Sequence, residues 1–194
     1  MFGGFCLSWG GFIVRSFEEA TVWEMLFLRS FFFLLALTLF LISIYKKNTI
    51  KIIKDSGVPG VLGGFVMSFS FVAFVLAMNS TTVANVVFII STQTMFLAIF
   101  GYFYLKEKVS LIGSISIFLA MSGIAIMVGD SISSGSLFGN LVALAIPINF
   151  AILVMIIRKN TNLDMVPAIF YSGVFSLIYG FFLTESFEFT SHDI

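Results

Sequence analysis

Three polar side chains in the apolar stretch 83–105 have the types and spacing needed to bind a small polar molecule. Asn85 and Thr92 are seven residues apart and would share one face of a helix, and Gln93 would lie beside that face. They could offer neutral hydrogen bonds to a substrate in a central cavity. The alternative is that they join helices, at about 0.6 kcal/mol per contact. An amide is hard to satisfy within its own helix, which favours the cavity interpretation for Gln93.

A fourth candidate for substrate binding, Asn149, follows a proline in the middle of the stretch 137–157. Pro147 removes a backbone donor and leaves the carbonyl of Ala143, four residues earlier, without its usual partner. Such breaks often face a substrate path in transporters. Proline kinks also occur in helices that only pack. Both interpretations remain open for this position.

The sequence offers no combination of residues suited to catalysis. The apolar stretches contain no His, Asp or Glu, and the whole chain has one Cys and one His. Acyl or phosphoryl transfer needs a nucleophile with a base, or clustered acids with a metal. We therefore expect no catalytic residue, no metal site and no cofactor. Because proton coupling usually uses a buried acid or His, we expect facilitated transport or exchange unless further helices supply that group.

The elements that would position these side chains are membrane-spanning helices. Hydrophobic residues make up 59% of the 194 positions and charged residues only 10%, against about 25% in soluble domains. A bilayer core needs roughly 20 apolar residues per helix. The apolar runs are Phe2–Val14, Met25–Tyr45, Val58–Met78, Val83–Leu105, Val109–Gly129, Leu137–Ile157 and Met165–Leu183. The composition predicts an all-α membrane protein, a polytopic helix bundle with lipid as its solvent.

Basic residues predict the orientation of this bundle. Eight of the ten lie after the second, fourth and sixth runs, namely Lys46, Lys47, Lys51, Lys54, Lys106, Lys108, Arg158 and Lys159. By the positive-inside rule these connections are cytoplasmic. We therefore expect a multi-pass protein of the cell (inner or plasma) membrane with a cytoplasmic N-terminus. The net charge of zero gives no reason to expect a nucleic-acid partner.

The chain aligns weakly with itself when Arg15 is placed on Arg158, an offset of 143 residues. Equivalent helices are then five spans apart, and an odd shift reverses the direction of the second copy. This predicts inverted five-helix repeats, with a first repeat at 1–128 whose first helix is clipped at its N-terminus. The second repeat, at 129–194, would hold two helices and be incomplete. The alternative is a small protein whose first segment is only interfacial.

The stretch Ala84–Gly129 carries a family resemblance in three places. It contains Ala84-Asn85-Val86-Val87, then Leu105-Lys106-Glu107-Lys108-Val109-Ser110, then Gly123-Ile124. With Trp9-Gly10-Gly11 and Arg29, it resembles the EamA domain of the drug/metabolite transporter superfamily. The resemblance implies ten helices, an inverted repeat and movement of metabolites such as amino acids, and it places Trp9 near the cavity as a further substrate-binding residue. Thr94, where the family often has proline, and Ser116, where it usually has glycine, depart from the pattern.

Several other residues have more than one interpretation. Arg29 could reach the surface, pair with Glu19 or Glu24, or bind an anionic substrate. Glu107 is expected to pair with Lys106 or Lys108 or to cap a helix. Small residues on one face permit close helix approach, within the bundle or at a homodimer contact; they are Gly113, Ser116, Ala120 and Gly123 in one run and Gly60, Gly63 and Gly64 in another.

The function these features favour is transport of a small polar metabolite, such as an amino acid or a related compound, by alternating access. The lipid bilayer and the metabolite are the expected partners. A structural or subunit role without transport of its own is the first alternative. An intramembrane enzyme is a weaker one, because the apolar runs lack the required groups.

Overall fold

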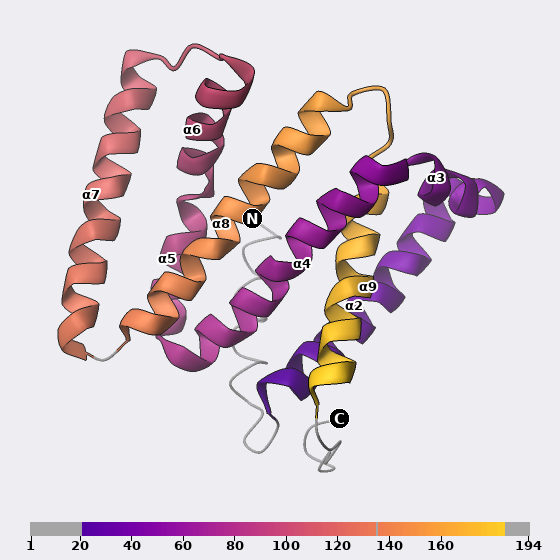
Figure 1. Cartoon of the computed structure of the whole chain (residues 1–194), viewed down its shortest axis with the longest axis horizontal. Coiled ribbons are helices and arrows are strands. Elements are labelled where there is room, and N and C mark those ends of the chain that lie inside the picture. Colours follow the sequence, from indigo (N-terminus) through magenta and orange to yellow (C-terminus); the bar gives the residue numbers. More distant parts are fainter. Residues whose placement is uncertain (1–20, 135, 185–194) are drawn as a thin grey trace.

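The computed structural model describes residues 21–134 and 136–184, and every regular element in these ranges is a helix (Figure 1). Five stretches within them are long and apolar enough to cross a membrane, with 83–105 counted as one. The predicted polytopic helix bundle is thus confirmed, while the expected run Phe2–Val14 lies outside the described residues. The elements are α2 (Val22–Tyr45), the 3-10 helix η1 (Lys46–Asn48), α3 (Thr49–Asp55), α4 (Gly57–Ser80), α5 (Val83–Ser91), α6 (Gln93–Leu105), α7 (Leu111–Ser134), α8 (Leu137–Lys159) and α9 (Val166–Leu183).

Local hydrogen bonds fix the ends of these helices. Helix α2 begins with a capping box, in which the Thr21 backbone N–H donates to Glu24 Oε2 at 2.6 Å and the Glu24 N–H donates to Thr21 Oγ1 at 3.4 Å. Helix α6 ends at Leu105, and its C-cap residue Lys106 is left-handed with φ 54°. The N–H of Glu107 then donates to the carbonyl of Gly101 at 3.2 Å. The connection 46–57, expected as a loop, is largely helical (η1 and α3).

Helix α4 is the centre of the bundle and packs along both α8 and α9 (Figure 1). The approach is close because glycine faces a neighbouring backbone. A Cβ on Gly64 would overlap Tyr171 and lie 2.7 Å from the carbonyl oxygen of Ala168 in α9, and a Cβ on Gly139 in α8 would lie 2.6 Å from the carbonyl carbon of Ser80. The close approach predicted for the α4 glycines is therefore confirmed.

Helices α2 and α9 lie antiparallel against each other. The hydroxyls of Ser30 and Ser176 are 2.8 Å apart, and a Cβ on Gly173 would lie 3.2 Å from the ring of Phe33. Ser30 lies opposite Ser176, and the later residue Phe33 lies opposite the earlier residue Gly173, so the two helices run in opposite directions. Ser30 and Ser176 are 146 residues apart in the sequence.

Helix α7 stands at the edge of the bundle, beside α6 (Figure 1). The close helix approach expected from its small residues does not occur between α7 and the other described helices. A Cβ on Gly113 would meet only Val109 and Ser110, next to it in sequence, and one on Gly123 would meet the ring tip of Phe88 at 3.3 Å. At Gly123 the neighbouring helix presents the large side chain of Phe88, and at Gly113 no other described helix comes within 4 Å. A homodimer contact through this face stays a prediction.

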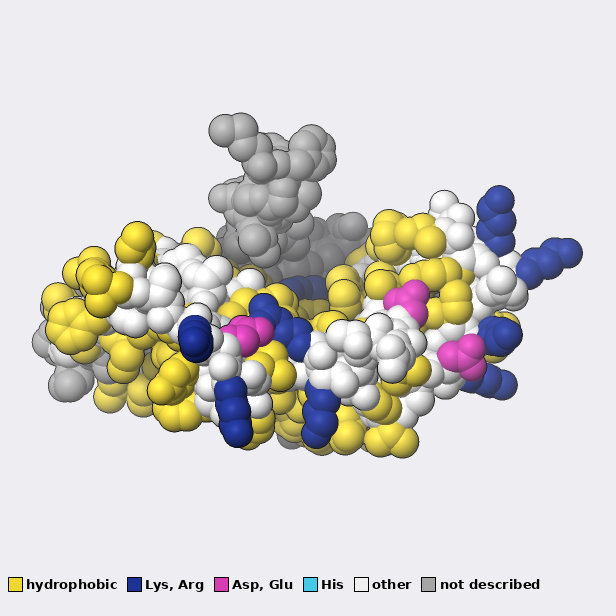
Figure 2. Space-filling model, turned by 90° about the horizontal axis from the view of Figure 1, so that it is seen from above, with side chains coloured by type: hydrophobic (Ala, Val, Ile, Leu, Met, Phe, Trp, Pro, Cys, Tyr) yellow, Lys and Arg dark blue, Asp and Glu magenta, His cyan; other side chains and the backbone are white. Residues whose placement is uncertain are grey.

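The connections that carry the eight basic residues all lie at one end of the bundle. These connections are η1 with α3, the α6–α7 turn and the C-terminal end of α8 (Figure 1). Figure 2 looks onto this end and shows Lys and Arg side chains gathered around a few acidic ones. We call it the basic end.

Glu107 has a different partner from the one expected at the basic end. Arg158 Nη1, at the end of α8, donates to Glu107 Oε1 at 2.7 Å and to Oε2 at 2.9 Å. The expected pairing with Lys106 or Lys108 is therefore wrong. The left-handed backbone at Lys106 folds Glu107 back over Gly101, where a Cβ would lie 2.7 Å from Glu107 Oε2. This position brings the carboxylate within reach of α8.

Candidate functional site

The span 83–105 is broken in its middle. Helix α5 ends at Ser91 and α6 begins at Gln93, and the backbone N–H of Thr92 donates to the carbonyl of Ile89, three residues back, at 3.1 Å. The hydroxyls of Ser91 and Thr92 donate to the carbonyls of Phe88 and Ile89, both at 2.6 Å. Such bonds compete with the helix ladder and bend helices. The break therefore follows from the run of four polar residues at 91–94.

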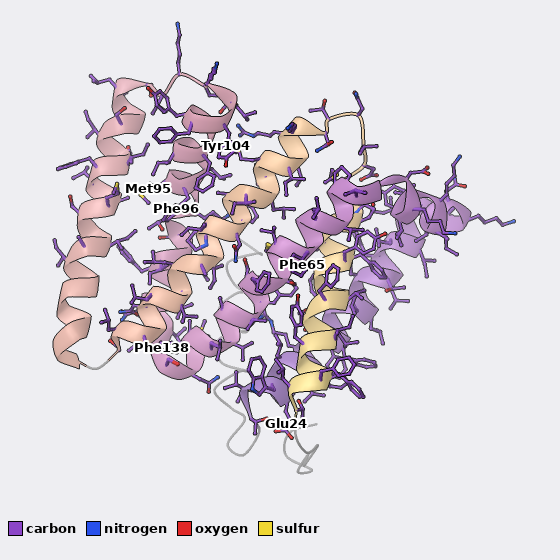
Figure 3. The ribbon with its side chains drawn as sticks, viewed as in Figure 1. Glu24, Phe65, Met95, Phe96, Tyr104 and Phe138 are labelled. Atoms are coloured by element: carbon purple, nitrogen blue, oxygen red, sulfur yellow. The ribbon has the colours of Figure 1, made fainter. Side chains whose placement is uncertain are left out.

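A cleft of about 490 Å³ opens beside this break, between α5–α6 and α7. Figure 3 shows one of its lining residues, Met95, between α6 and α7. The α5–α6 side contributes Phe88, Ser91, Thr92, Thr94, Met95 and Ala98, and α7 contributes Gly113, Ser116, Ile117, Leu119 and Ala120. Three of the four small residues of α7 that were expected to pack against a helix thus line this cleft instead, namely Gly113, Ser116 and Ala120.

The lining of the cleft is neutral and carries four hydroxyl groups. Ser91, Thr92 and Ser116 donate their protons to carbonyls of their own helices, Ser116 to that of Ile112 at 2.9 Å. Their oxygens keep lone pairs that can accept hydrogen bonds. Thr94 makes no side-chain hydrogen bond within the described ranges, so its hydroxyl can both donate and accept. The cleft can therefore hold an uncharged polar group against an apolar wall.

Asn85 lies in a polar cluster at the end of the bundle opposite the basic end. Its Nδ2 donates to Thr81 Oγ1 at 3.2 Å and to Asn140 Oδ1 at 3.3 Å, and Thr81 Oγ1 donates to the same Asn140 oxygen at 2.7 Å. Asn140 is fully buried. The cluster joins the α4–α5 turn to α8, as the helix-joining alternative requires. Substrate binding by Asn85 stays a prediction.

The other predicted binding residues do not meet at the cleft. Of the five, only Thr92 lines it. Gln93 and Asn149 are half-buried on α6 and α8 and are not among its lining residues, and Trp9 lies outside the described residues. Next to the buried Pro147, Ser70 of α4 donates to the carbonyl of Ile146 at 3.5 Å. The roles of Trp9, Thr92, Gln93 and Asn149 in substrate binding stay predictions.

A second cleft, of about 430 Å³, lies between α6 and α8 towards the basic end. It is lined by Phe100, Tyr104, Leu105, Ile152, Met155, Ile156 and Lys159. The rings of Phe100 and Tyr104 are stacked, with centroids 6.1 Å apart. Because this wall is apolar except at Lys159, it suits an acyl chain or an apolar side chain better than a polar metabolite.

Three hydroxyl-bearing residues of the first cleft were not among the predicted binding residues, namely Ser91, Thr94 and Ser116. Thr94 was noted only as a departure from the EamA pattern, and Ser116 as such a departure and as a small packing residue. A signal for both was present in the sequence, because each stands where the EamA pattern has a different residue. The distance between α7 and α6 could not be predicted from the sequence. Because the two helices stand apart, the small residues of α7 line a cleft and do not pack against α6.

Comparison with protein families decides the identity of this arrangement. The model of the EamA-like transporter family matches residues 1–129. The chain belongs to the EamA-like transporter family. Searches of curated proteins and of solved structures gave no match. Together with the spans of the bundle, family membership makes this EamA-like protein a multi-pass membrane transporter.

Proposed function

We propose that this EamA-like chain moves a small polar metabolite, such as an amino acid or a related compound, by alternating access. The observation that carries the proposal is the mid-span break at Thr92, which bears hydroxyl groups and opens on a cleft. Broken spans are where transporters commonly place their substrate sites, because irregular backbone is tolerated only where it lines a cavity. We further propose that the protein has no catalytic activity, as expected of a transporter family.

The contact between α2 and α9 supports the proposed inverted repeat, with repeats at 1–128 and 129–194. The self-alignment offset of 143 makes Ser30 equivalent to Gly173 and Phe33 equivalent to Ser176. Ser30 contacts Ser176, and Phe33 faces Gly173. Equivalent helices of an inverted repeat run antiparallel, as α2 and α9 do here. In this proposal the two repeats rock against each other about that contact.

The basic end supports the proposed orientation. Eight basic residues converge there, which by the positive-inside rule makes this end cytoplasmic. Helix α2 would then begin outside the cytoplasm, and the N-terminus would be cytoplasmic. We propose the cell (inner or plasma) membrane as the location.

Counterflow in proteoliposomes tests the transport proposal. Full-length protein would be reconstituted with a panel of radiolabelled amino acids, and Thr92→Val and Gln93→Leu compared with the wild type. Because a neutral hydrogen bond contributes about 1 kcal/mol, we expect KM to rise roughly fivefold for each variant at unchanged protein yield. Ser122→Ala is the control, since its hydroxyl only bonds the carbonyl of Phe118 in α7.

Two results would contradict the proposal. The first is the absence of flux for every compound of the panel in well-folded protein. The second is flux with the same KM in the wild type and in both the Thr92→Val and Gln93→Leu variants. The second result would indicate that Thr92 and Gln93 contribute to helix packing and not to substrate binding.

A further inference from the structure

Arg29 places a charged group inside the bundle. It lies seven residues into α2 from Val22, about 10 Å along the helix axis at 1.5 Å per residue. Its guanidinium carbon is 4.4 Å from the ring centroid of Phe74 and 5.2 Å from that of Phe71, both in α4. Nη1 is buried and has no hydrogen-bond partner in the part of the chain that the structure describes.

The two rings hold the cation without using its hydrogen-bond donors. A cation over an aromatic face is attracted by the ring quadrupole, and this attraction does not satisfy an N–H group. Phe71 is itself held by an edge contact with Phe33 of α2, with centroids 5.2 Å apart. Arg29 is therefore fixed in position while part of its planar donor set stays open.

Glu24, the acid nearest to Arg29 along the helix, is engaged elsewhere. Its carboxylate accepts hydrogen bonds from the backbone and hydroxyl of Thr21, at 2.6 and 2.9 Å. Five residues along a helix also turn the two side chains by roughly 140° at about 100° per residue, so they point to different sides. Among the described residues, Arg29 forms no ion pair with an acid.

An unpaired charge in hydrocarbon is costly, and such residues in transporters mark substrate paths. The guanidinium matches carboxylate in two-point geometry. We propose that Arg29 is the anion-recognition point of this protein and takes the carboxylate of the transported metabolite. This inference rests on the proposed transport function and adds to it a substrate class, metabolites that carry a carboxylate group.

A carboxylate could reach Arg29 from two sources, a soluble metabolite or the chain's own Glu18 and Glu19, which lie outside the described residues. The experiment must separate them. Thermal unfolding of purified full-length protein would be followed with acetate, L-alanine and succinate, each compared with its amide at matched ionic strength. The same titrations would be run on a Glu18→Gln/Glu19→Gln double variant.

We expect the carboxylates to raise the Tm of the wild type and of the double variant, and the amides to have no effect. Arg29→Gln should weaken the response, with an apparent Kd raised roughly tenfold or more, because a hydrogen bond to a charged group is lost. Arg158→Gln is the matched control, since it removes a cation that already has a partner and should leave the response intact.

Three outcomes would overturn the inference. They are an equal response to the amides, an unchanged response in Arg29→Gln, and a response that appears only after Glu18 and Glu19 are neutralised. If Arg29→Gln does not fold, Arg29→Lys and Phe74→Leu replace it. The first keeps the charge without the two-point geometry and the second removes one ring, so each should raise the apparent Kd several-fold.

The binding and flux measurements can contradict the transport function and the role of Arg29 independently of each other. Carboxylate binding through Arg29 without any flux would contradict the transport function and leave the anion site standing. Flux of compounds that lack a carboxylate, with the same kinetics in Arg29→Gln, would support transport and contradict the role of Arg29.

Discussion

Glycines line the face of α4 that meets α9 and also the face of α7 that looks towards α6, yet the two faces pack differently. In the core (α4, α8 and α9), a Cβ on Gly64 would overlap Tyr171 and approach the carbonyl of Ala168. In the arm (α5, α6 and α7), a Cβ on Gly113 would meet only side chains adjacent to it in sequence, and the face borders a cleft. Small residues therefore bring helices into close contact in the core, whereas in the arm they border a cleft.

The largest expected difference between the two regions comes from replacing one glycine on each face with a larger residue. Gly64→Leu should lower the free energy of unfolding by about 3 kcal/mol, the upper part of the usual range for overpacking, because the obstacle is backbone as well as side chain. Gly113→Leu should change it by less than about 1 kcal/mol and reduce flux instead, since its side chain would enter the cleft. Reversible unfolding in mixed micelles measures both. Equal destabilisation would mean that the arm packs as tightly as the core.

A smaller effect is expected from the polar groups of the two regions. Asn140→Leu in the core removes the acceptor shared by Thr81 and Asn85, and should cost about 1–3 kcal/mol because the Thr81 donor stays buried. Ser116→Ala in the arm removes only a bond to the carbonyl of its own helix, and should cost less than about 0.5 kcal/mol. The same unfolding measurement compares them, and a larger loss for Ser116→Ala would reverse the assignment of core and arm.

The smallest effect should come from the ion pair that ties the arm to the core at the basic end. Glu107 and Arg158 are about half exposed, with side-chain exposures of 51% and 43%, so their coupling should stay below about 1 kcal/mol. A double-mutant cycle with Glu107→Gln and Arg158→Gln measures it, and added salt should weaken it further. A coupling that is large and insensitive to salt would indicate a buried link instead.

Hydropathy was enough to locate the five spans of the described residues, because a run of about twenty apolar residues has few alternatives to a membrane helix. The run Val109–Gly129 is a helix in the structure, but it is not among those five. Glycine spacing likewise predicted the close approach of α4 to its neighbours. Both features depend on residues close together in sequence. The functional class, a membrane transporter, was predicted from the family resemblance, and the match of the EamA-like transporter family to residues 1–129 supports it.

The partners of individual polar residues were harder to predict, because they depend on contacts between distant segments. Glu107 is 51 residues from Arg158, and Asn85 is 55 residues from Asn140. The sequence predicted a binding role for Thr92, which lines the cleft, but none for Ser116 of α7, which also lines it. That pairing depends on how far α7 stands from α6, and no local pattern encodes that distance.

The span 83–105 is anchored to α8 near both tips, through Asn85 and Asn140 at one end and Glu107 and Arg158 at the other. Both contacts oppose sliding of this span along α8. Bending is easier, and the span is weakest at the interrupted turn at Thr92. Widening of the adjacent cleft would then come from flexing about one residue, with the two fastenings left in place.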